Sequence, residues 1–232
     1  MKITFVGTGA GATFSSKRVK ASIYLKSDEG ASILLDLGTG ANFKLEDFNL
    51  LDFSAIFITH LHIDHVSGVF DHLVQRKVMR MPEITVYSPS GFSKLLSAYK
   101  ETGNDISAIV YENELPRAKI GDLEIYSVEA CHSIYAVSYM ITDGKKKIIY
   151  TGDTSEPCEP ILKESKDADL IIHEGSCIEG CEQYGHTPVP KVINTFNNKR
   201  LIITHIPSQI EEEIKRIAKG YNLAFDGMTI NV

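Results

Sequence analysis

Short apolar runs rich in β-branched residues alternate with segments of helical spacing along the whole chain, and four of these runs end in histidine or acidic residues. This alternation predicts an α/β fold built from buried strands. Because α/β proteins gather their sites at the carboxyl ends of strands, the four ends predict one shared rim that carries chemistry. They are Phe57-Ile58-Thr59-His60, Ile149-Tyr150-Thr151-Gly152-Asp153, Ile171-Ile172-His173-Glu174 and Ile202-Ile203-Thr204-His205.

The same patterns predict the order of the elements. The apolar runs predict strands at 3–6, 22–25, 33–36, 55–58, 84–87, 123–126, 135–141, 148–150, 170–172 and 201–203. Helical spacing predicts helices at 65–75, 90–101, 156–165, 188–197 and 208–219. No low-complexity tract or repeat divides the sequence, so we expect residues 1–232 to form a single domain.

Charge and cysteine content narrow the class of protein. The net charge of −6 disfavours a dedicated nucleic-acid binder, although a local basic patch can still steer a phosphate substrate. The four cysteines are too irregularly spaced to predict a disulfide framework, so we expect reduced thiols. Neither a signal-peptide pattern nor an apolar stretch of membrane-spanning length is present. These features predict a cytoplasmic protein that does not bind a membrane.

The segment His60-x-His62-x-Asp64-His65 places three imidazoles and a carboxylate within six residues. Imidazole nitrogen and carboxylate oxygen suit zinc, manganese and iron(II), and no thiolate is interspersed to indicate a structural zinc site. The spacing predicts a loop that opens a helix, with Asp64 and His65 in the first turn. The segment therefore predicts a metal site rather than a polar loop that happens to contain histidines.

Three more residues supply the ligands that a two-metal site needs beyond this segment. Two-metal hydrolytic sites hold their ions about 3.5–4 Å apart and need six or seven ligands. His132, Asp153 and His205 each follow or adjoin an apolar run. The two oxygens of Asp153 allow it to bridge both ions. Alone, His132 is equally compatible with a surface position, and Asp153 with a turn or helix cap.

This ordered set resembles the metallo-β-lactamase superfamily over almost the full length of the chain. The matching positions begin with Asp36 in Leu34-Leu35-Asp36-Leu37-Gly38 and continue through the residues above. The resemblance implies an αββα sandwich of two mixed sheets with helices outside and two divalent ions, zinc first and manganese or iron as alternatives. It implies that His60, His62 and His132 hold one ion, that Asp64, His65 and His205 hold the other, and that Asp153 bridges them.

Two further motifs resemble the ribonuclease Z branch and its phosphodiesterase relatives. They are Phe5-Val6-Gly7-Thr8-Gly9-Ala10-Gly11, and Ile172-His173-Glu174-Gly175-Ser176 followed by His186-Thr187. The resemblance implies that His186 protonates the leaving oxygen or contacts the scissile phosphate, and that Glu174 orients it. Attack by a hydroxide that the two ions share makes hydrolysis the expected reaction.

The interval between His132 and Asp153 is too short for the long transfer-RNA-binding arm of ribonuclease Z. The shorter chain favours a small or single-stranded phosphodiester substrate, such as a cyclic nucleotide or a modified sugar phosphate. The missing arm also leaves the site exposed enough for a homodimer to complete it.

Other functions explain less of the sequence. Gly7-Thr8-Gly9-Ala10-Gly11-Ala12 matches a dinucleotide-binding fingerprint, but residues 13–24 predict a loop and a strand where a nucleotide-dependent oxidoreductase needs a helix. A hydrolase of the same superfamily that cleaves a thioester, lactone or sulfate ester is the closer alternative. We expect His72 on a helix surface or face and His173 as a packed histidine, while Cys177 and Cys181 have the spacing of a weak chelating pair.

Overall fold

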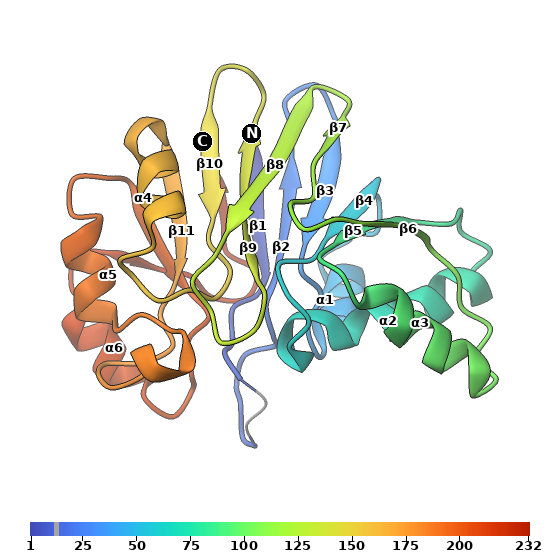
Figure 1. Cartoon of the computed structure of the whole chain (residues 1–232), viewed down its shortest axis with the longest axis horizontal. Helices are drawn as coiled ribbons and strands as arrows, with labels where there is room; N and C mark the ends of the chain where they lie inside the picture. Colours follow the sequence, from blue (N-terminus) through green and yellow to red (C-terminus); the bar gives the residue numbers. More distant parts are fainter. Residues whose placement is uncertain (12–13) are drawn as a thin grey trace.

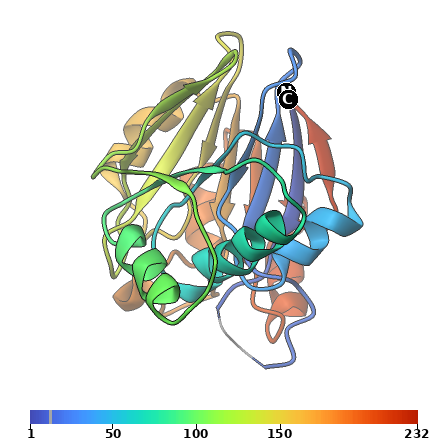
Figure 2. The ribbon, with the colours of Figure 1, turned by 90° about the vertical axis from the view of Figure 1, so that its right-hand side faces the viewer.

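Two sheets of seven strands pack face to face, and helices cover the outer face of each sheet. The computed structural model describes residues 1–11 and 14–232. Figure 1 shows the four layers edge-on, and Figure 2 shows them after a quarter turn. The predicted αββα sandwich is confirmed.

The first sheet is built from the N-terminal half of the chain and its last strand. Its helices are α1 (Ala41–Asp47), α2 (Ile63–Val78) and α3 (Phe92–Glu101). The last strand pairs with the first, so the two termini lie together. In spatial order the strands are β14 (Thr229–Asn231), β1 (Lys2–Gly7), β2 (Ser22–Lys26), β3 (Ser32–Leu35), β4 (Ala55–Phe57), β5 (Thr85–Ser88) and β6 (Ile109–Glu112).

The second sheet is built from the C-terminal half. Its helices are α4 (Glu159–Glu164), α5 (Val189–Thr195) and α6 (Glu211–Ile217), with short 3-10 turns η1 (Ser165–Asp167) and η2 (Glu182–Tyr184). In spatial order the strands are β13 (Asn222–Leu223), β12 (Leu201–Thr204), β11 (Leu170–Glu174), β10 (Lys147–Tyr150), β9 (Val137–Thr142), β8 (Leu123–Glu129) and β7 (Ala118–Ile120).

Three apolar cores hold the layers together. The central core lies between the sheets, where Phe57 meets Tyr139 edge to face at 5.5 Å. On β4, Phe57 faces this core while its neighbour Ile56 faces the core under α1 to α3. A third core joins the second sheet to α4, α5 and α6. Because the central strands are buried on both faces, their sequences are continuous apolar runs rather than alternating ones.

Most predicted elements are present with shifted ends. Every predicted strand run overlaps an observed strand, and the five predicted helices correspond to α2 to α6. The helix predicted from residue 156 begins only at Glu159, because Pro157 and an extended Cys158 precede it. The seven-residue α1 and four short strands (β6, β7, β13 and β14) were not predicted. The longest helix is α2 with 16 residues, and within the described ranges no helix has the length and apolar character needed to cross a membrane.

The cysteines are paired, so the expectation of reduced thiols is wrong. Cys131 forms a disulfide with Cys158 across 27 residues, and Cys177 forms one with Cys181 across 4. Their Cα atoms are 5.7 and 6.3 Å apart, distances that a disulfide spans. The first pair depends on tertiary folding, since its halves follow β8 and precede α4. The second pair removes the thiols that a chelating site at Cys177 and Cys181 requires.

Two histidines outside the predicted site are packed in the interior. His72 is 1% exposed and stacks on Phe53 with 5.5 Å between ring centroids, so it lies on the buried face of α2 and not on the surface. His173 is also buried and lies against Phe196, as expected for a packed histidine.

Candidate metal centre

The four strand ends that the sequence singled out meet at one edge of the sandwich. Strands β10, β11 and β12 are neighbours and parallel, so their carboxyl ends share an edge. The end of β4 reaches them from the other sheet, where Thr59 accepts a hydrogen bond from the Val137 amide. Gly152 has φ 58°, and a Cβ atom there would lie 2.9 Å from Thr59 Cβ. A glycine at this position therefore permits the close approach of the two strand ends.

The histidine-rich segment has the predicted local structure. His62 is extended and precedes α2, and Asp64 and His65 lie in the first turn of that helix. An acidic residue in the first turn is favoured by the positive end of the helix dipole. The segment therefore projects four side chains from a strand end, a short loop and a helix start into one space.

His60, His62 and His132 direct one nitrogen each toward a common point. His62 Nδ1 lies 3.1 Å from His60 Nε2 and 3.0 Å from His132 Nε2. Nitrogens bound to zinc at about 2.0–2.1 Å in tetrahedral geometry lie roughly 3.3 Å from one another. Burial and the neighbouring His65 hold the pKa of His60 well below its ordinary value, so this ring is neutral and offers a lone pair. The three nitrogens fit one metal ion.

Asp64, His65 and His205 form a second group whose ligand atoms lie within 4.8 Å of one another. Asp153 lies between the two groups. Its Oδ2 is 3.6 Å from His60 Nε2, while its Oδ1 is 3.4 Å from His65 Nε2 and 3.3 Å from His205 Nε2. One carboxylate thus presents one oxygen to each group.

The buried atoms of this centre have no protein partners to satisfy them. Among the described residues, none hydrogen-bonds to His65 Nε2 or Asp153 Oδ1, although both atoms are shielded from water. Burial alone would raise the pKa of Asp153, but His205 and His65 hold it well below its ordinary value. An ionised carboxylate oxygen and a ring nitrogen without partners are costly unless a cation joins them. The donor set fits metal ions.

Hydrogen bonds orient the rings from behind. His65 Nδ1 is 2.8 Å from Asp36 Oδ2, and His132 Nδ1 is 2.8 Å from the Gly185 carbonyl. Such contacts fix the tautomer, so that the other nitrogen has its lone pair free for a metal. In the sequence, Asp36 belongs to the motif Leu34-Leu35-Asp36-Leu37-Gly38. Its position directly after β3 is the signal that it belongs to this rim.

Asp36 and His205 share an unusual backbone conformation. Each has φ 55°, in the left-handed region that non-glycine residues seldom adopt. Such outliers cluster at functional sites, because the surrounding contacts hold them in place. Both residues follow a strand and turn their side chains into the rim.

Glu174 and His186 form a pair beside the two groups. Glu174 Oε1 lies 2.9 Å from His186 Nδ1, which is 3.9 Å from Asp153 Oδ2. The Thr154 and Ser176 amides also donate to the Glu174 carboxylate, which holds it in place. Burial opposes the charged imidazole, but the hydrogen bond and charge of Glu174 outweigh it and raise the pKa of His186 to about 9. His186 thus has a proton to give at neutral pH.

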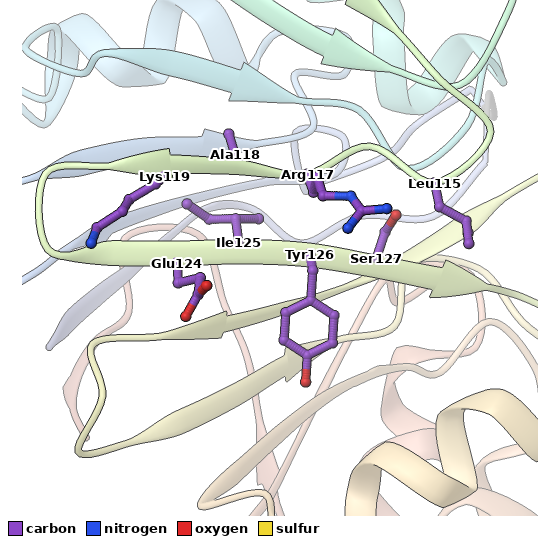
Figure 3. A pocket seen from close by; sticks show the side chains of 8 residues that line it. All are labelled: Leu115, Arg117, Ala118, Lys119, Glu124, Ile125, Tyr126 and Ser127. Carbon is purple, nitrogen blue, oxygen red and sulfur yellow. The ribbon is translucent and has the colours of Figure 1, made fainter.

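The centre opens into a pocket of about 400 Å³ whose walls include Ala10, Ile63, Cys181 and Pro207. Figure 3 shows a larger hollow, of about 530 Å³, along β7 and β8. Of the residues labelled there, Glu124 alone has a side chain of the metal-binding type. The chemistry of the donor set, and not the size of the hollow, identifies the smaller pocket as the candidate site.

Residues 1–219 match the family described as "Anti-Pycsar protein Apyc1". The chain belongs to this family. The match leaves out only the last 13 residues, so it covers every predicted site residue of this Apyc1 family member.

Among curated proteins, this Apyc1 family member is similar to the ribonuclease Z of Methanosarcina acetivorans. The two are 24% identical over an alignment of 293 positions that covers 99% of this chain and 95% of the archaeal protein. The alignment is longer than the 232 residues of this chain, so the archaeal protein has insertions relative to it.

Solved structures show the same fold. Human tRNase Z, short form, superposes with a TM-score of 0.83 at 22% identity and covers 100% of this chain and 99% of its own. The metallo-beta-lactamase fold protein YhfI of Bacillus subtilis superposes with a TM-score of 0.80 at 20% identity, and the match covers 99% of this chain and 98% of YhfI. The predicted place in the metallo-β-lactamase superfamily, near ribonuclease Z, is confirmed.

The dinucleotide-binding alternative requires a helix directly after the glycine-rich segment. The described residues 14–21 form turns and bends instead, and β2 begins at Ser22.

Proposed function

We propose that this Apyc1 family member is a phosphodiesterase that uses two divalent metal ions, most simply zinc, with manganese or iron as alternatives. The observation that carries the proposal is Asp153, whose two oxygens face two separate groups of ligands. In this proposal His60, His62 and His132 hold one ion, and Asp64, His65 and His205 hold the other. The names of the curated ribonuclease Z relatives support phosphodiester chemistry.

Each residue of the centre then has a role in hydrolysis. When bound, the ions lower the pKa of water at the site and neutralise charge on the oxygens of the substrate. Asp153 keeps the two ligand groups at a fixed separation. His186, held by Glu174, donates its proton to the leaving oxygen. The ionised Asp64 completes the second ligand group.

We propose a small or short single-stranded substrate, such as a cyclic nucleotide. Between His132 and Asp153 the chain forms β9, a turn at Asp143-Gly144 and β10, with no room for a separate RNA-gripping arm. The insertions in the longer ribonuclease Z support the same conclusion. We further expect a single catalytic domain spanning residues 1–232, action in the cytoplasm, and a homodimer in which a second copy closes the exposed mouth of the pocket.

A hydrolysis screen on purified protein of known metal content tests the proposal. A bis-aryl phosphodiester, cyclic nucleotides, precursor transfer RNA and a thioester are assayed in parallel for wild type, Asp64→Ala and His186→Ala. Asp105→Ala, an exposed acidic residue beyond α3, serves as the matched control. We expect phosphodiester turnover that is lost with Asp64→Ala and kept with Asp105→Ala.

Two results would contradict the proposal. Fewer than one bound metal ion per chain, or turnover unaffected by Asp64→Ala, removes the metal centre from the mechanism. Thioester turnover without phosphodiester turnover assigns the centre to the alternative reaction.

A further inference from the structure

Lys20 is a buried lysine that the proposed chemistry does not use. It precedes β2 and is 6% exposed. Its Nζ donates to the Ala10 carbonyl at 2.9 Å and to Ser16 Oγ at 3.1 Å. Burying an ammonium group is costly unless its contacts compensate. Both of these acceptors are neutral, so the charge of Lys20 can act only through the groups that these acceptors contact in turn.

The Ala10 carbonyl belongs to the same peptide group as the Gly11 amide. That amide donates to Asp64 Oδ2 at 2.7 Å. Lys20 and Asp64 therefore hold the two ends of one planar peptide unit, the ammonium at the oxygen and the carboxylate at the N–H. Because the unit is rigid, fixing its oxygen also fixes the direction of its N–H.

The packing around this unit leaves it little other freedom. The Gly9 amide donates to the Val19 carbonyl at 2.9 Å, and the Gly9 backbone pairs with Lys20. On the other side, a Cβ atom on Gly38 would lie 2.6 Å from Lys20 Cβ and 1.9 Å from the Asp64 carbonyl oxygen. Lys20 is thus packed directly against the backbone that carries Asp64.

We propose that Lys20 is a positioning residue that acts on Asp64 through the Ala10–Gly11 peptide and so strengthens metal binding by the Asp64, His65 and His205 group. This inference rests on the proposed metal centre. A cation at the carbonyl polarises the peptide and strengthens the N–H hydrogen bond at its other end. That bond holds the Asp64 carboxylate in one orientation, with its remaining lone pairs free for an ion.

Zinc dissociation constants, measured on metal-free protein by competition with a chelator and without substrate, test the inference. Lys20→Met removes both the charge and the donor at nearly constant volume. We expect the dissociation constant of one of the two zinc ions to rise about 10- to 100-fold, the usual effect of losing a residue that hydrogen-bonds to a metal ligand. The other ion should keep its affinity. Lys20→Arg, which keeps a cationic donor, should stay close to wild type.

The matched control is Lys17→Met, which removes the same charge from an exposed position of the same loop. We expect it to leave both dissociation constants unchanged. Thermal unfolding of the metal-free proteins is measured alongside, because a purely structural anchor would lower the melting temperature without favouring one ion over the other.

The outcomes separate the two proposals. If Lys20→Met binds both zinc ions with wild-type affinity, or binds both more weakly by the same factor, the role of Lys20 is overturned. A wild type that binds none of zinc, manganese and iron(II) overturns the metal centre itself, and the inference about Lys20 with it. If Lys20→Met does not fold, Lys20→Gln replaces it, since the glutamine side chain is uncharged and one bond shorter than that of lysine. The same loss is expected there, and wild-type affinity in that variant likewise overturns the inference.

Discussion

Asp36 Oδ2 accepts a hydrogen bond from His65 Nδ1 at 2.8 Å, and both side chains are fully buried. The same carboxylate accepts from the Thr59 amide at 2.7 Å and from the Tyr150 hydroxyl at 2.8 Å. These donors hold the Asp36 carboxylate in one orientation. This contact orients the His65 ring so that its Nε2 faces Asp153 Oδ1 at 3.4 Å. In the proposed metal centre, Asp36 orients a ligand without being a ligand itself.

Asp36→Asn tests this relationship. An amide can present an N–H toward His65 Nδ1 and reverse the tautomer, so we expect about 10- to 100-fold weaker zinc binding. The measurement is chelator competition on the metal-free protein. Asp52 is exposed and, like Asp36, lies between β3 and β4, so Asp52→Asn should bind zinc as the wild type does. Equal affinities for the two variants would show that the His65 tautomer does not depend on Asp36.

His186→Ala should slow turnover and leave the metal centre intact. Loss of a general acid typically costs about 10²- to 10⁴-fold in rate. The loss should be large for an alkyl or nucleoside leaving group and small for 4-nitrophenolate, which leaves without a proton. The ratio of kcat values for the two substrates is the measurement, with metal content checked in parallel. Tyr184→Ala, exposed in the same loop, is the control. An equal loss on both substrates would argue against proton donation.

The pH dependence of turnover should have an alkaline limit set by His186. The proton that His186 donates is present below its pKa, so activity is full there and is lost as the pH rises through that value. The metal-free pKa is about 9, raised chiefly by Glu174 and further by Asp153 and Asp64. Bound ions neutralise the last two carboxylates, so we expect the limit between 6.5 and 9.

Glu174→Gln should move this limit toward lower pH, because the neutral amide no longer favours the imidazolium. The pH profile of kcat for wild type and Glu174→Gln gives the comparison. An alkaline limit that stays in place in Glu174→Gln would mean that another group sets it.

The disulfide between Cys177 and Cys181 should support the position of His186. The Cys181 carbonyl accepts the amides of Tyr184 at 2.9 Å and of His186 at 3.3 Å, so the bridge anchors the segment that carries His186. Replacing both cysteines by serine should lower kcat and leave metal content unchanged. Thiol titration of the denatured but unreduced wild type should find no free thiols, because all four cysteines are paired. Unchanged kcat in the serine variant would show that the bridge does not serve the site.

The sequence by itself determined the features that depend on neighbours along the chain. The period of apolar residues marks the central strands, and the spacing of His60, His62, Asp64 and His65 places them at a strand end and a helix start. Both signals are local, because strand and helix periods follow from backbone geometry. The order of strand ends that carry histidine or acid also sufficed to predict one shared rim.

Only the tertiary structure decided which distant groups meet. The short strands β6, β7, β13 and β14 have little signal of their own and form because a neighbouring strand offers hydrogen bonds. His72 is buried because Phe53 covers it, and Cys131 reaches Cys158 because β8 and α4 lie side by side. The contacts of Asp36 with His65, and of Lys20 with the Ala10 carbonyl, likewise join segments whose spacing in the chain gives no sign of the pairing. Packing and hydrogen bonding between layers create these pairs, and no local pattern in the sequence encodes them.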